Sequence, residues 1–392
     1  MIGALAAGWF AGAALLWQTA APDLQLVHLD PAQVFSREHV ERSSRYESFH
    51  RANWTAATVV QIGVLLVIVR LAPRFRRQGL VGGLALGVGT LVAAWLAGLP
   101  FVIAAQWWRR RYGVSDAGYG TILVDPWLER IGSLVAAAGA IGLFMLLARR
   151  LGDRWWIVGG PAFALVGSVF LLAQPLLLAP RLEPLRDPAL VAEIRELARE
   201  QGVGKVDVEV RDASRRTRAI NAELYGIGPS KRIVIWDTAL ERLGRPELRV
   251  LVSHELGHVE AHHVWKSVGW IVLFAVPGAY VVAVVTRRRG GLAEPAAVPL
   301  ALLTIAILQL ALLPAADAIS RRYEREADWL ALSTTRDPTA FEGLTKKLAD
   351  AALADPEPPR WARIVLGTHP TPLERIELAR TLVRAEGLPA GS

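Results

Sequence analysis

Long apolar runs dominate this sequence and restrict it to folds that place helices in a membrane. Residues 2–20 contain no charged side chain, and a helix needs about twenty such residues to cross a bilayer. Similar runs recur along the chain, at 2–20, 54–71, 80–105, 128–148, 155–179, 266–286 and 296–316. We therefore predict a mainly α-helical, polytopic membrane protein with about seven transmembrane helices.

Composition narrows the chemistry that such a chain can perform. The chain has no cysteine, which excludes disulfides, cysteine–zinc sites, iron–sulfur clusters and thiol catalysis, so a transition-metal site must use His, Asp and Glu. The net charge is +8, and in a membrane-rich protein basic charge usually marks loop ends and lipid headgroup contacts. We therefore expect membrane lipid among the partners and no nucleic acid.

The composition changes at Pro180, which predicts two regions, 1–180 with five helices and 181–392 with two more. Residues 181–263 have the character of a soluble segment, with helix starts at Asp187-Pro188 and Pro246 and strands at 205–211 and 232–236. Exactly two spans separate this segment from the tail 317–392. Both pieces must therefore lie on the same side of the membrane.

The strongest chemical motif is His254-Glu255-Leu256-Gly257-His258 on the helix predicted after Pro246. Residues i and i+4 share a helical face about 6 Å apart along the axis, so both imidazoles can reach one zinc ion at about 2.0–2.1 Å. Glu255 is then placed to act as base on a zinc-activated water. Half of the eight histidines fall within 254–263, and the roles of His262 and His263 stay open.

A third ligand is expected because zinc hydrolases use three protein ligands and one open position. Glu324 and Asp328 are again i and i+4, in a helix predicted at 317–332. Glu324 would complete the set for one Zn²⁺ per chain. Asp328 would accept the distal N–H of a ligating histidine and fix its tautomer. Taken alone, these segments can also be interpreted as a polar helix face at the membrane surface and a solvated charged helix.

Four stretches resemble the zinc-dependent, multi-span type I CAAX prenyl endopeptidases. They are His254–His258, Ser320–Asp328, Asn221–Gly226 with Lys231–Ile235, and Thr368-His369-Pro370 with Glu374-Arg375. The order of these elements agrees with the family, and the likeness spans most of the chain. In the Asn221 segment, Ala222-Glu223 stands where aromatic residues are common in the family.

This resemblance implies seven helices enclosing a chamber, with a gluzincin-like zinc metallopeptidase domain that carries a small β-sheet. It also implies that His254, His258 and Glu324 bind zinc and that Glu255 activates the water. Asn221 and His369 would face the tetrahedral intermediate, where an amide N–H and an imidazole N–H are suitable oxyanion donors. The catalytic face would be cytoplasmic.

The sequence therefore predicts a membrane-embedded zinc metalloendopeptidase that hydrolyses lipidated, CAAX-type or membrane-associated peptides. The substrate, which the family implies could be prenylated, would add as an extended strand to an exposed edge near 231–236. One alternative is a heat-shock-type membrane protease that degrades damaged membrane proteins. Another is a transporter or receptor without enzymatic activity. The sequence predicts no oligomeric state.

Overall fold

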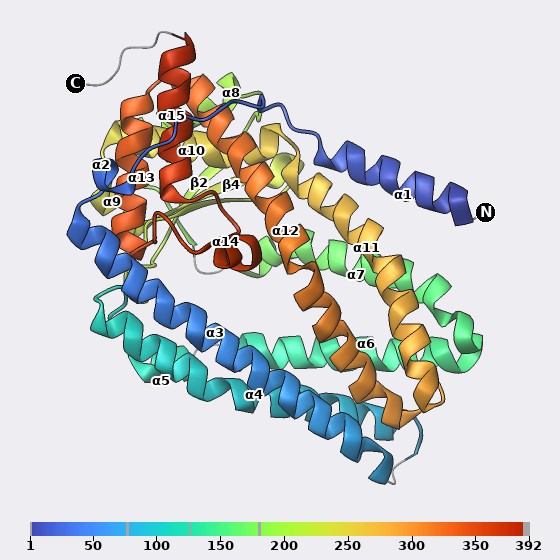
Figure 1. Cartoon of the computed structure of the whole chain (residues 1–392). Helices are drawn as coiled ribbons and strands as arrows, with labels where there is room; N and C mark the ends of the chain where they lie inside the picture. The colour runs from blue at the N-terminus through green and yellow to red at the C-terminus, as the bar shows by residue number, and fades with distance from the viewer. Residues whose placement is uncertain (1, 76–77, 125–126, 179–181, 387–392) are drawn as a thin grey trace.

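The computed structural model describes residues 2–75, 78–124, 127–178 and 182–386, and it is mostly helical (Figure 1). The N-terminal half contains α1 (Ile2–Trp17), α2 (Pro31–Val34), α3 (Arg37–Leu71), α4 (Gly79–Arg111), α5 (Tyr119–Val124), α6 (Trp127–Leu151) and α7 (Trp155–Leu178). The C-terminal half contains α8 (Pro188–Glu200), α9 (Asp237–Arg242), α10 (Arg245–Glu260), α11 (His263–Thr286), α12 (Val298–Thr335), α13 (Pro338–Ala352), α14 (Arg360–Leu366) and α15 (Pro372–Glu386).

By length and composition, five helical stretches of the described chain could cross a membrane, at Arg37–Arg74, Gly79–Arg111, Arg130–Leu172, His263–Arg289 and Pro295–Thr335. The third stretch holds both α6 and α7, which a 3-10 turn at Gly152–Arg154 joins. Helix α1 has 16 residues and extends about 24 Å, against about 30 Å for a hydrocarbon core. The predicted count of seven spans is therefore not confirmed.

The boundary predicted at residue 180 stays a prediction, and residues 179–181 lie outside the described ranges. N-terminal residues reach across it, because the backbone N–H groups of Val27 and Leu29 donate to Thr381 and Glu377 of α15. The chamber implied by the resemblance also stays a prediction. Figure 1 places the sheet, α10, α13 and α15 together at one end of the long helices.

A four-stranded sheet lies beside α10, in the order β1 (Leu182–Pro184), β2 (Asp207–Arg211), β4 (Arg232–Trp236), β3 (Ala222–Tyr225). β2 and β4 are parallel, and the two outer pairs are antiparallel. The expectation of an exposed edge near 231–236 is wrong, because β4 is an inner strand whose Ile233, Val234 and Ile235 are fully buried. A continuous run of apolar residues is typical of a strand covered on both faces. The strand at the edge of the sheet beside β4 is β3.

Helix α12 differs from the sequence prediction in a way that matters for the site. The sequence predicts an apolar run at 296–316 and a separate soluble helix at 317–332, whereas the structure has one helix of 38 residues. Pro314 lies inside it without ending it. One continuous helix therefore extends from the apolar region to Glu324 and Asp328.

Candidate metal centre

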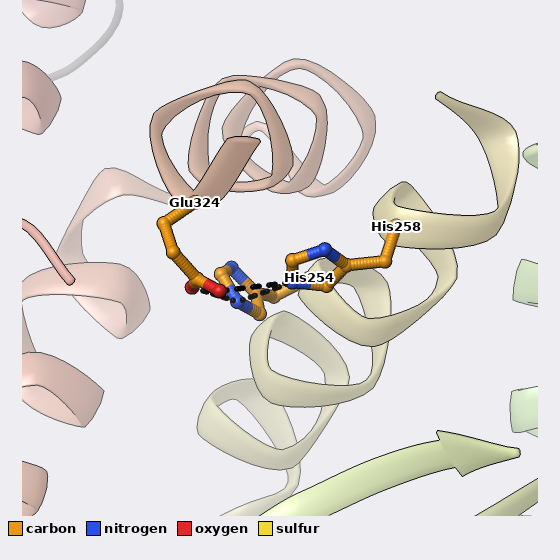
Figure 2. A group of neighbouring side chains, drawn as sticks. All are labelled: His254, His258 and Glu324. Carbon is orange, nitrogen blue, oxygen red and sulfur yellow. Dashed lines mark hydrogen bonds and ion pairs between the residues drawn. The ribbon is translucent and has the colours of Figure 1, made fainter. Parts of the chain in front are cut away.

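The two histidines of the motif lie on one face of α10, opposite Glu324 of α12 (Figure 2). Gly257 permits this approach, since a Cβ atom at this position would lie 3.3 Å from both Cα of Ala327 and Cβ of Leu330. Any larger residue would push α12 away from α10. The glycine between the two histidines is therefore part of what brings the carboxylate to the imidazoles.

Three nitrogen and oxygen donors converge at this point. Nε2 of His254 lies 3.3 Å from Nε2 of His258 and 3.2 Å from Oε2 of Glu324, and Nε2 of His258 lies 3.6 Å from Oε1 of Glu324. Tetrahedral zinc bonded at about 2.0–2.1 Å requires ligand atoms about 3.3 Å apart. All three atoms lie within 4.8 Å of one another, so this donor set could hold such a cation.

Asp328 lies behind His254, on the side away from the donors. Its Oδ1 is 2.9 Å from Nδ1 of His254, and its two oxygens accept hydrogen bonds from Arg375 at 2.6 and 2.9 Å. The Asp328 side chain is only 1% exposed. Burial lowers the pKa of His254, but the contacts with Asp328 and Glu324 outweigh burial and raise it to about 10. That value describes the metal-free group, in which a proton takes the place of a cation.

The Glu255 carboxyl lies near both the donor set and the sheet, because the charges of His254, Glu324 and Glu223 all act on it. Burial raises the pKa of its carboxyl to about 7, although the charge of His254 and a hydrogen bond from the Leu224 backbone both oppose this shift. Leu224 belongs to β3, so the carboxyl lies against the edge strand. A buried carboxyl group beside a cation site is placed to accept a proton from a water molecule there.

His369 and Asn221 differ in how they relate to the three donors. Nε2 of His369 lies 3.4 Å from Oε2 of Glu324, and its side chain is 62% exposed. Asn221 directly precedes β3; its side chain donates to Glu223 at 3.5 Å, and its carbonyl accepts from the Trp236 backbone. The structure thus brings His369 to the centre, whereas the hydrogen bonds of Asn221 join it to the sheet.

Two residues near the centre were not predicted from the sequence. Nδ1 of His258 lies 2.8 Å from Nδ1 of His263, and Nε2 of His263 lies 2.8 Å from Oε2 of Glu326. Crowding of histidines at 254–263 was visible in the sequence, but no spacing pointed to the contact with Glu326.

Comparisons with known proteins find metalloproteases among the similar chains. The family model described as "Peptidase family M48" matches residues 184–383. The chain is 31% identical over 250 residues to "Uncharacterized metalloprotease YhfN" of Bacillus subtilis, covering 60% of this chain and 59% of that protein. It is 29% identical over 159 residues to "Probable CAAX prenyl protease 1" of Schizosaccharomyces pombe, covering 40% of this chain and 33% of that protein.

The whole fold also matches a solved structure. The crystal structure of S. mikatae Ste24p superposes with a TM-score of 0.76 at 17% identity, covering 95% of this chain and 96% of that one. At this identity the match establishes the fold alone. The curated relatives are matched over less than two thirds of their own lengths.

Proposed function

Because the chain belongs to peptidase family M48, we propose that it is a membrane zinc metalloendopeptidase. The observation that carries this proposal is the set of three donors from His254, His258 and Glu324, spaced for one tetrahedral cation. Five apolar stretches long enough to cross a bilayer support a location in the membrane, and the fold matches that of S. mikatae Ste24p. One zinc ion per chain would occupy the centre. The catalytic face of the protein would lie on the cytoplasmic side of the membrane.

Zinc, when bound, acidifies a water molecule to a pKa of about 7 and polarises a carbonyl group. The chain itself handles the proton. Glu255 would accept it as the water oxygen attacks the peptide carbon, and would return it to the amine nitrogen as the C–N bond breaks. The products are a carboxylic acid and an amine. Burial raises the pKa of the Glu255 carboxyl in the metal-free protein, which favours the proton-accepting role.

Three further residues would support this step. Asp328 would hold His254 with its Nε2 facing the cation, because Nδ1 is only 2.9 Å from the buried carboxylate. His369 would donate from its imidazole to the developing oxyanion, a role supported by its 3.4 Å approach to Glu324. Asn221 would donate from its side-chain amide, whose second N–H remains for this role beside the weak hydrogen bond to Glu223.

The proposed substrate is a lipidated, CAAX-type or membrane-associated peptide. The names of relatives such as "Probable CAAX prenyl protease 1" support this class. Its backbone would add to β3, the edge strand whose Leu224 contacts Glu255, rather than near 231–236. A prenyl group or a membrane-spanning segment would then lie among the apolar helices.

The test compares purified wild type with Glu255→Gln and, as matched control, Glu260→Gln at the end of the same helix. We expect one zinc per chain in all three proteins. Cleavage of a prenylated CAAX peptide should fall by about 10²–10⁴-fold in Glu255→Gln only. Cleavage by Glu255→Gln at the wild-type rate would refute the base assignment, and absence of zinc from wild type would refute the metallopeptidase itself.

An unmodified membrane-associated peptide provides the second arm of this experiment. Equal cleavage of prenylated and unmodified peptides would refute a specific requirement for the lipid. It would favour the broader degradation of membrane proteins.

A further inference from the structure

His263 contacts the metal-ligand candidate His258 from the side away from the cation site. Helix α10 ends at Glu260, and His262 adopts a left-handed conformation with φ of 58°. This single residue reverses the chain so that His263, the first residue of α11, folds back onto α10. Its Nδ1 then lies 2.8 Å from Nδ1 of His258.

The other nitrogen of His263 fixes the direction of these hydrogen bonds. Nε2 lies 2.8 Å from Oε2 of Glu326, and both residues are almost fully buried, with 4% and 2% exposed. A carboxylate only accepts, so Nε2 of His263 carries the hydrogen and Nδ1 has the free lone pair. Nδ1 of His258 must therefore donate, which leaves its Nε2 lone pair directed at the cation site.

From this geometry we propose that His263 and Glu326 are positioning residues that fix the metal-binding tautomer and ring orientation of His258. This inference rests on the metal centre proposed above. Asp328 contacts Nδ1 of His254 directly, whereas at His258 the carboxylate acts through an intervening imidazole. Ring stacking of His263 on Tyr323, at 4.5 Å and 11°, restrains that imidazole further.

Glu326 is itself held by the segment that follows α1. The Ala20 backbone N–H donates to its Oε1, and Nζ of Lys266 lies 3.2 Å from its Oε2. Arg322 and Tyr323 also donate to carbonyls in the last turn of α1, at Trp17 and Leu16. The orientation of His258 therefore depends on contacts between segments more than 300 residues apart in sequence.

The test measures zinc affinity by chelator competition and the visible spectrum of the Co²⁺-substituted protein. His263→Ala should weaken zinc binding by about 10–100-fold and alter the cobalt spectrum. His262→Asn is the matched control: the His262 side chain is exposed and forms no hydrogen bond or ion pair within the described chain, and asparagine also tolerates the left-handed conformation, so we expect wild-type affinity. His263→Asn restores an acceptor near the Nδ1 position and should recover part of the affinity.

Glu326→Gln retains an acceptor oxygen and should lose less affinity than His263→Ala. Wild-type zinc affinity and an unchanged cobalt spectrum in a folded His263→Ala protein would overturn the positioning role. Failure of wild type to bind zinc would instead overturn the metal centre, so the two failures are distinguishable.

An independent observation concerns a cavity of about 220 Å³ between the segment after α1, α12 and α14. Four arginines line it, against two acidic residues: Arg321, Arg322, Arg325 and Arg363 with Asp23 and Glu374. Arg325 forms no hydrogen bond or ion pair with the residues described in this structure. The cavity therefore has an excess of positive charge and at least one unpaired guanidinium.

We infer that this cavity binds the phosphate of an anionic phospholipid headgroup. Arginine suits phosphate because its planar donors can bind two oxygens at once. Trp17, which ends the apolar helix α1, also lines the cavity and is 40% exposed, with Arg322 stacked 5.1 Å over its ring. Exposed tryptophan beside arginine at the end of an apolar helix is typical of the membrane–water interface.

The full chain in phosphatidylcholine nanodiscs should be stabilised against heat by added phosphatidylglycerol. Arg325→Gln should weaken that lipid binding about fivefold. Arg288→Gln, an exposed arginine in the loop between α11 and α12, is the matched control and should leave it unchanged. Equal stabilisation by inorganic phosphate would identify free phosphate as the ligand and overturn the lipid. No difference between the two variants would overturn the cavity as the site.

Discussion

Apolar side chains are buried around the metal centre, whereas many of those on the long apolar helices are exposed. Around the metal centre Leu256, Ile233 and Phe341 are fully buried, as in a water-soluble domain. In α3, α4 and the α6–α7 stretch only 11% of each apolar window is buried, and Phe170 of α7 is 61% exposed. This difference indicates that the hydrophobic residues of the two ends face different surroundings, water around the metal centre and lipid around the long helices. Burial stabilises the catalytic end, whereas lipid would solvate the outward faces of the helices.

The charged groups sharpen this contrast, because the catalytic end also buries paired charges. Asp328→Ala should have the largest effect, since it leaves Arg375, whose side chain is 14% exposed, without its counter-charge. We expect a loss of about 3–5 kcal/mol in the free energy of unfolding. Zinc affinity should fall by about 10–100-fold as His254 loses its support. Denaturant titration and chelator competition measure the two effects.

Glu342→Ala is the matched control for this substitution. Glu342 pairs with Arg380 and Lys346 at 2.8 Å each, but both partners are about a third exposed. Its loss should cost less than about 1 kcal/mol and leave zinc binding unchanged. Equal losses in the two variants would show that burial of the pair at Asp328 has no energetic consequence.

One substitution made at both ends tests the two-solvent comparison directly. Phe341→Ala should cost about 3–5 kcal/mol, because the ring is fully buried and its removal leaves a cavity. Phe170→Ala should cost less than about 1 kcal/mol, since lipid can fill the space that the exposed ring leaves. Unfolding in bicelles measures both, and a large loss at Phe170 would mean that α7 packs on another protein surface.

Sequence patterns predicted most of the centre because its residues follow helical spacing. His254 with His258, and Glu324 with Asp328, are i and i+4 pairs, and a rigid helix keeps such pairs on one face. The structure brings both pairs together. The positions of helices were predictable for the same reason, since hydropathy is a property of a continuous run.

Features that depend on contacts between elements could not be predicted in this way. His263 reaches His258 only because His262 is left-handed, and residues other than glycine adopt that conformation too rarely for the sequence to predict it at one position. The edge strand β3 has four residues, too few for an alternating pattern to register. Helix α12 changes from apolar to charged residues along its length, so the sequence pattern indicated two helices. The backbone stays helical through this change, and α12 is one helix of 38 residues.

Close packing between the apolar helices should have a smaller effect on stability than burial at the catalytic end. A Cβ atom at Gly160 of α7 would lie 2.8 Å from Cα of Val276, so Gly160→Ala must separate α7 from α11. We expect a cost of about 1–3 kcal/mol. Gly139→Ala in α6 meets nothing within 4 Å and should be neutral or stabilising by up to about 1 kcal/mol. Thermal unfolding of both variants in bicelles provides the measurement.

A final prediction concerns the titration of Glu255, whose pKa burial raises from 4.5 to about 7. The folded metal-free protein therefore holds this proton more tightly than the unfolded chain does. Its contribution to stability is fully present below pH 4.5 and is lost as the pH rises through about 7. The unfolding temperature of metal-free wild type should fall between pH 5 and pH 8. Glu255→Gln, which cannot ionise, should flatten that decline, whereas identical slopes would show that Glu255 titrates normally and that the centre is open to water.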